Sequence, residues 1–210
     1  MTSTLRGALL TTGALALSAC ATLAGHAPTG AANEQAWQAR VATLTTLGTW
    51  ELSGRVGVVN GKDGGSGSLD WNQDGDELRF DFRGPLGAGA VHIEGDSAAL
   101  HVQSSQGDDF VTTDPEDDFA RHLRMPMPVF SMRYWMLGVP DPGAPYLKIA
   151  DAQGEPLSLS QRGWQVNYQE YADVSGRSLP VRFTLSRGEV RIKVAVSQWT
   201  LAPAAATKSP

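Results

Sequence analysis

The sequence predicts an α+β protein whose antiparallel strands form a sheet that curls around one face. Apolar residues alternate with polar ones over most of the chain, and turn-forming stretches separate these runs, as in a meander. Helical spacing is found only near residue 37 and in the middle of the chain. The strands therefore fall into two meanders divided by a helical insertion, an order that suits one curved sheet with helices on one side.

The first element predicted is a helix. Asn33 can cap it, Trp37, Val41 and Leu44 recur on one face, and Gly48 lies past its end. The apolar period then changes from three-to-four to two, which predicts strands. The first meander comprises strands over 52–58, 69–71, 78–82 and 91–93, with turns over 60–67 and 74–76.

Two short helices interrupt the strands. Thr113 or Asp114 can cap the first, Pro115 suits its first position, and the acidic residues 116–118 complement the helix dipole. Residues 129–137 predict the second helix, which Gly138 ends. The second meander comprises strands over 146–149, 157–160, 164–168, 181–185 and 190–199.

The N-terminal segment is typical of a bacterial lipoprotein signal. An apolar run over 8–19, preceded by Arg6 as its only charge, ends at Cys20, the single cysteine of the chain. The sequence Leu-Ser-Ala-Cys resembles a lipobox, so we expect cleavage before Cys20 and lipidation of its sulfur and amine. The alternatives are an ordinary signal peptide beside a stray cysteine, or a lone thiol in a cytosolic protein.

This interpretation divides the chain into four parts. Residues 1–19 form the signal peptide, 20–33 a lipidated N-terminus with a flexible tether, 34–200 the folded domain and 201–210 a disordered tail. Because Cys20 is the only cysteine, no disulfide can stabilise the domain. About 190 residues remain after cleavage, enough for one domain with a sizeable core.

Composition and motifs argue against several classes of function. Loss of Arg6 takes the net charge from −5 to −6, and an acidic chain without a basic stripe is a poor match for nucleic acid. The stretches 61–67 and 114–118 lack the spacing of a phosphate loop, a dinucleotide fold or a calcium loop. The four histidines show no metal-ligand spacing. We therefore expect no enzyme, no metal, no cofactor and no nucleic-acid partner.

A set of ordered phrases resembles the LolB family of outer-membrane lipoprotein receptors. Each phrase alone is weak, but their order and spacing cover nearly the whole mature domain. They are WELSGRV (50–56), GSLDW (67–71), RGPLG (83–87), MPV (127–129), YWMLG (134–138), QRGWQVNY (161–168), Leu179-Pro180 and Trp199. The sequence departs from the family in the glycine-rich stretch 61–67 and in the tail beyond Trp199.

The resemblance implies an unclosed antiparallel β-barrel, a half-barrel with a helical lid over an apolar cavity. In the family this hollow takes the acyl chains of lipoproteins from the periplasmic carrier LolA and passes them to the outer membrane. The partners implied are LolA, acylated lipoprotein cargo and outer-membrane lipid, the last through the acyl chains on Cys20. Ala21 agrees with outer-membrane placement because it is not the aspartate that retains many lipoproteins in the inner membrane. We expect a monomer.

An acyl-binding hollow needs an apolar, adaptable lining. Four of the five methionines lie in the helical insertion, and their unbranched side chains repack easily around different ligands. The alternative is that the same residues form a filled core. The candidates for the lining are Val56, Trp71, Phe80, Phe82, Ile93, Met127, Met132, Trp135 and Met136.

Leu86 is a further candidate, because it lies on a turn between Pro85 and Gly87 where an apolar side chain has little reason to point inward. The resemblance marks it as the exposed leucine that delivers cargo to the membrane, whereas an incidental surface leucine is the plain alternative. Two other functions remain open from the residues alone: a lipoprotein that binds another amphiphile in the same hollow, such as a phospholipid or glycolipid, and a scaffold lipoprotein that binds nothing.

Overall fold

A computed structural model describes residues 29–87 and 89–202, which form one antiparallel sheet and three α-helices. Cys20 lies outside the described residues. The helices are α1 (Thr29–Thr45), α2 (Pro115–His122) and α3 (Val129–Met136), with a short 3-10 turn, η1, at Pro85–Gly87. The strands are β1 (Thr49–Asn60), β2 (Asp63–Asp74), β3 (Glu77–Arg83), β4 (Val91–Gly95), β5 (Leu100–Ser104), β6 (Asp109–Thr112), β7 (Tyr146–Ala150), β8 (Pro156–Gln161), β9 (Trp164–Val174), β10 (Arg177–Arg187) and β11 (Val190–Leu201).

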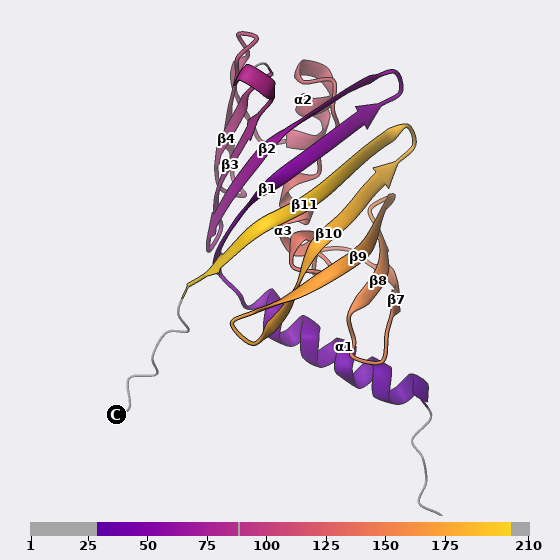
Figure 1. Cartoon of the computed structure of the whole chain (residues 1–210). Coiled ribbons are helices and arrows are strands. Elements are labelled where there is room, and N and C mark those ends of the chain that lie inside the picture. The colour runs from indigo at the N-terminus through magenta and orange to yellow at the C-terminus, as the bar shows by residue number, and fades with distance from the viewer. Residues whose placement is uncertain (1–28, 88, 203–210) are drawn as a thin grey trace, which may run out of the picture.

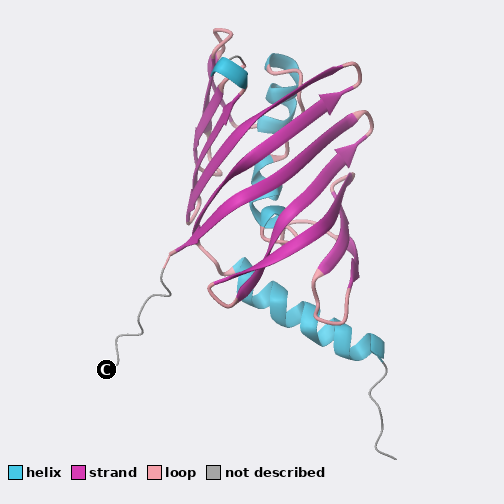
Figure 2. Cartoon of the chain, in the orientation of Figure 1, coloured by secondary structure: helices cyan, strands magenta, loops and turns pink. Residues whose placement is uncertain are grey.

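The sheet is a half-barrel. Its eleven strands run in the order β6-β5-β4-β3-β2-β1-β11-β10-β9-β8-β7, so the first and last strands of the chain pair at its centre. The edge strands β6 and β7 are joined through α2 and α3, and these helices lie against the inner face of the curved sheet (Figure 1). Figure 2 shows the same arrangement, with strands on one side and the helical segment behind them. The predicted fold class is confirmed.

Cross-strand pairing sets which side chains face inward. Leu52 pairs with Trp71, Trp71 with Phe80, Phe80 with Ile93 and Ile93 with Val102. All five are buried, so they form one continuous apolar row across five strands. Trp71 adds edge-on contact with Phe80, their ring centroids lying 5.6 Å apart. This row fills the middle of the half-barrel.

Helix α1 crosses one end of the sheet (Figure 1). Trp37 is fully buried and donates from Nε1 to the Tyr146 hydroxyl at 3.1 Å. The guanidinium of Arg40 donates to the carbonyl oxygens of Leu137 at 2.9 Å, Gly138 at 3.2 Å and Ser178 at 2.9 Å. These bonds satisfy carbonyl groups at the end of α3, so α1 closes this end of the half-barrel and holds α3 in place.

Some predicted boundaries were wrong. Helix α1 begins at Thr29, so Asn33 lies inside the helix and does not cap it, and residues 29–33 are not tether. The predicted turn over 60–67 is only two residues long, because β2 already begins at Asp63 and continues the pairing with β1. Strands β5 and β6 were not predicted, since neither has a long enough alternating run to stand out in the sequence.

Candidate functional site

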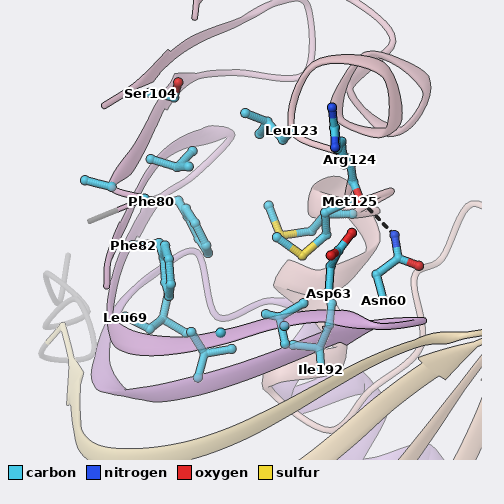
Figure 3. A pocket seen from close by; sticks show the side chains of 18 of the residues that line it. Asn60, Asp63, Leu69, Phe80, Phe82, Ser104, Leu123, Arg124, Met125 and Ile192 are labelled. Carbon is cyan, nitrogen blue, oxygen red and sulfur yellow. Dashed lines mark hydrogen bonds between the residues drawn. The ribbon is translucent and has the colours of Figure 1, made fainter. Parts of the chain in front are cut away.

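A cavity of about 660 Å³ lies between the inner face of the sheet and the helical segment, toward the β1–β2 hairpin tip. Figure 3 shows the side chains of Phe80 and Phe82 on one side of it and Met125 on the other. The residues that line it are Val56, Val58, Asn60, Asp63, Gly64, Gly65, Leu69, Phe80, Phe82, Gly89, Ala90, Val91, Ser104, Gln106, Asp108, His122, Leu123, Arg124, Met125, Met127, Met132, Met136, Ile192 and Val194.

The sheet side of the cavity is apolar because the register brings aliphatic and aromatic residues together. Val56 pairs with Val194 on β11, and Val58 pairs with Ile192. On the other flank Leu69 pairs with Phe82, and Phe82 pairs with Val91. On β2, β3 and β11 these side chains alternate with polar residues on the other face, such as Asp70, Asp81 and Lys193, which is the pattern of a sheet that faces a hollow on one side and solvent on the other.

The helical side is rich in methionine. Met125, Met127, Met132 and Met136 all line the cavity. Helix α2 is fixed by Phe119, which is fully buried, and by an ion pair between Glu116 and Arg187. The lid defined by residues 115–137 is therefore anchored to the sheet, while its methionines present adaptable side chains to the cavity.

Polar groups gather at the mouth of the cavity. Asn60 and Asp63 lie at the β1–β2 tip, Gln106 and Asp108 at the β5–β6 turn, and Arg124 in the segment between α2 and α3. Asn60 Nδ2 donates to the backbone carbonyl of Arg124 at 2.8 Å, the dashed line in Figure 3. An apolar interior below a polar rim fits a ligand with apolar chains and a polar head.

The structure places six of the nine predicted lining residues in the cavity wall. They are Val56, Phe80, Phe82, Met127, Met132 and Met136. Trp71 and Ile93 are corrections: they face inward but belong to the filled row across β1–β5, 1% and 0% exposed. Phe80 lies between them in this row and reaches the cavity, and the wall continues in the next row toward the hairpin tip with Leu69, Phe82 and Val91.

Trp135 is the third correction. It is fully buried, and its Nε1 donates to Gln161 Oε1 at 2.8 Å. Its backbone carbonyl accepts from the Tyr168 hydroxyl at 2.9 Å, and burial raises the pKa of Tyr168, so that hydroxyl stays a donor. Trp135 therefore fixes α3 to β8 and β9 on the side away from the cavity.

Sequence reasoning missed several lining residues. Val58, Ile192 and Val194 belong to strands that were predicted, and the alternation over 52–58 placed Val58 on the face of Val56, but none of the three was chosen as a lining candidate. Val91 and Leu69 required the register of β3 with its neighbours, which the hairpin turns alone did not give. The polar residues of the mouth had no signal in the sequence.

Leu86 is fully exposed on η1, as predicted from the turn. Its backbone has φ 55° and ψ 24°, a left-handed conformation that is unfavourable for leucine by about 1 kcal/mol or more. The N–H of Gly87 donates to the carbonyl of Gly84 at 3.0 Å and closes the turn. Gly89 and Ala90, which follow this turn, line the cavity, so the exposed leucine lies beside its mouth.

Two further findings concern the described residues. Within residues 29–87 and 89–202, no group of three or more His, Cys, Asp or Glu side chains could hold a metal ion. No helix in that part of the chain combines the length and apolar character needed to cross a membrane.

The chain matches known proteins over most of its length. Residues 48–199 match the model of the family described as outer membrane lipoprotein LolB. A protein of Alkalilimnicola ehrlichii named outer-membrane lipoprotein LolB is 38% identical over 201 residues, 94% of this chain and 99% of that protein. A protein of the same name from Nitrosococcus oceani is 33% identical, over 88% of this chain and 92% of its own.

Solved structures share the fold at low identity. A DUF1329 family protein from Desulfovibrio piger superposes with a TM-score of 0.53 at 9% identity, covering 83% of this chain and 93% of that one. A LolA superfamily protein from Nitrosomonas europaea gives 0.51 at 9% identity, covering 80% and 94%. The half-barrel with a lid, the cavity beneath it and the match over residues 48–199 lead to one conclusion: the chain belongs to the LolB family of outer membrane lipoproteins.

Proposed function

We propose that this protein is an outer-membrane receptor that accepts acylated lipoproteins from the periplasmic carrier LolA and inserts them into the outer membrane. The observation that carries the proposal is the apolar cavity under the lid, with a polar mouth beside an exposed leucine. Membership of the LolB family supports the same role. The proposal concerns binding and transfer and requires no chemical reaction.

The physical need for such a cavity follows from the cost of exposing lipid. Moving an acyl chain into water costs about 0.8 kcal/mol for each methylene group. A cargo with several chains therefore needs an apolar surface at every stage between two membranes. Val56, Phe82 and Ile192 on the sheet and Met125 and Met132 on the lid provide one.

The direction of transfer needs no energy source in this protein. A chain passes from the carrier to the receptor and then to the bilayer if each step is downhill in affinity for the acyl group. The structure is consistent with intermediate affinity, because the polar residues Asn60, Asp63 and Asp108 border the same cavity that the apolar residues line.

The lipid anchor is a separate part of the proposal. Cys20 would carry the acyl chains that hold the protein on the periplasmic face of the outer membrane, while the cavity handles the cargo. Eight residues, 21–28, lie between Cys20 and Thr29, the first residue of α1. The mature chain with Cys20→Ala should then be released from the membrane and still accept cargo.

The deciding experiment is transfer in vitro. LolA loaded with a triacylated lipoprotein is mixed with the receptor, and the lipoprotein is followed from carrier to receptor and from receptor to liposomes. The proposal requires transfer that depends on the cargo's acyl chains. Equal capture of acylated and unacylated cargo would contradict it.

The same material tests the second reading, in which the cavity holds a phospholipid or glycolipid. Mass spectrometry of lipid that co-purifies with the protein would identify such a ligand. A tightly held phospholipid that loaded carrier cannot displace would favour that reading over the receptor.

A further inference from the structure

Resting on the proposed function, we propose that Gly65 determines how many acyl chains the cavity admits at once. Gly65 lies on β2 opposite Val58, and both residues line the cavity on its sheet side. The inward-facing positions of β2 run Gln73, Trp71, Leu69, Gly67, Gly65 and Asp63, because each pairs with an inward-facing position of β1. Near the mouth the wall of the cavity is therefore bare backbone.

The fold requires glycine at some positions of this hairpin and not at others. A Cβ on Gly67 would lie 2.3 Å from the carbonyl oxygen of Arg83 and 2.6 Å from the ring of Phe82, so the packing of β2 on β3 requires glycine there. A Cβ on Gly65 would meet no atom within 4 Å, and its backbone is not left-handed. The fold does not require glycine at 65, although glycine weakens a strand interior.

The size of the cavity suggests a use for the open space beside Gly65. A volume of about 660 Å³ lies within the range of pockets that enclose most of one drug-sized ligand. A cargo with several long acyl chains has more apolar surface than the deep part of such a cavity can cover. Further chains of the same cargo must occupy the region nearest the mouth.

That region is lined by Gly65 and Val58 on the sheet and by Met125 on the lid, with Asp63 at the β1–β2 tip. Figure 3 shows the side chains of Asp63 and Met125. A leucine side chain at 65 would fill on the order of 100 Å³ of it. The deep part of the cavity, lined by Phe80, Met132 and Met136, would be unchanged. One chain would still fit, whereas additional chains would be displaced into water.

The test compares Gly65→Leu with Gly57→Leu. Gly57 lies on β1 in the same hairpin, also has no atom within 4 Å of an added Cβ, is not left-handed, and does not line the cavity. Its alternation with Val56 and Val58 directs a side chain to the opposite face of the sheet. The two variants therefore add the same side chain to the two faces of one hairpin.

Both variants are made in the mature chain from residue 20 with Cys20→Ala, which keeps every described residue. Synthetic cysteine peptides bearing one or three hexadecanoyl chains are titrated against a bound apolar fluorescent dye. We expect Gly65→Leu to weaken displacement by the three-chain peptide by about tenfold or more, since that corresponds to two or more methylene groups returned to water. Displacement by the one-chain peptide should change less than about twofold, and Gly57→Leu should match the parent.

If Gly65→Leu behaves like Gly57→Leu, or weakens both peptides equally, Gly65 does not set the number of chains. Gly65→Ala is a smaller change that serves if the leucine variant does not fold. The thermal unfolding midpoint of every variant shows whether it is folded. If folded Gly65→Ala and Gly65→Leu both keep the three-chain affinity of the parent, the inference is also overturned. A parent protein that binds neither peptide would instead overturn the proposed function itself.

Discussion

The side chain of Asn60 holds the backbone of Arg124 across the mouth of the cavity. Asn60 Nδ2 donates to the Arg124 carbonyl oxygen at 2.8 Å, and Arg124 has a left-handed φ of 54°. This bond joins the β1–β2 tip to the segment between α2 and α3. Because that segment also carries Met125, the bond ties the position of the lid to the sheet at the mouth of the cavity.

Asn60→Ala is therefore expected to speed exchange of bound ligand. Loss of one hydrogen bond removes about 0.5–1.5 kcal/mol, which favours lid opening by roughly two- to tenfold. Stopped-flow measurement of an apolar dye should show association and dissociation rates that rise together, with little change in Kd. The matched control is Asn72→Ala, which removes a 2.7 Å bond to Glu51 on the outer face of the same hairpin. Rates equal to those of this control would show that the bond does not restrain the lid.

Phe82→Asp is expected to abolish ligand binding by the cavity. Phe82 lines the wall beside Leu69, and a carboxylate there would face an apolar ligand at a desolvation cost of several kcal/mol. Ile149→Asp makes the same change at a residue that is 64% exposed on β7 and outside the cavity. Dye titration of both folded variants is the measurement. Retained affinity in Phe82→Asp would place the ligand elsewhere.

Much of the cavity lining could be predicted from the sequence, but Trp71 and Ile93 were wrongly included in it. Alternation identifies which residues of a strand share a face, so Val56, Phe80 and Phe82 were assigned correctly. It does not say how far along the sheet the interior is filled. Trp71 and Ile93 satisfy the same pattern and flank Phe80 in one row, but they are enclosed by the core while Phe80 reaches the cavity.

The lid posed a different difficulty. Its methionines were assigned from composition, which suits adaptable apolar side chains, but Trp135 in the same helix has a polar Nε1 that needs a partner. The partner, Gln161, lies on β8, 26 residues away. A contact between residues so far apart along the chain depends on the topology of the sheet, so the sequence around Trp135 could not predict it.

Acid is expected to destabilise the protein partly through Asp141. Burial opposes ionisation of this carboxyl, but the Gly143 N–H, the Ser131 hydroxyl and Arg162 all donate to it and hold its pKa below the usual value. Since the pKa is lower in the folded chain than in the unfolded chain, the stabilisation is present above the ordinary aspartate pKa. It is lost as the pH falls through the folded value.

Asp141→Asn should therefore lower the free energy of unfolding at neutral pH by about 1–3 kcal/mol and reduce its dependence on pH below about 5. Urea unfolding at several pH values measures both effects. A variant whose stability falls with acid as steeply as that of the parent would show that other carboxyl groups carry the acid sensitivity.

Leu86 is expected to act when cargo leaves the cavity and not when cargo enters it. The side chain is fully exposed, and the turn presents it in a strained backbone conformation beside Gly89 and Ala90 at the mouth. Inserting a leucine into the apolar part of a bilayer is worth roughly 1.5–3 kcal/mol. That is too little to anchor the protein but enough to hold the mouth against the membrane for a short time.

Leu86→Glu should leave folding and acceptance from loaded LolA unchanged, because Gly84 and Gly87 close the turn through backbone atoms. Delivery into liposomes should slow by about tenfold or more, with loaded receptor accumulating, since the favourable insertion is lost and a charge must approach lipid. Leu147→Glu is the control, because Leu147 is also exposed but lies on β7 away from the cavity. Delivery at the parental rate, or loss of acceptance together with delivery, would make Leu86 an ordinary surface leucine.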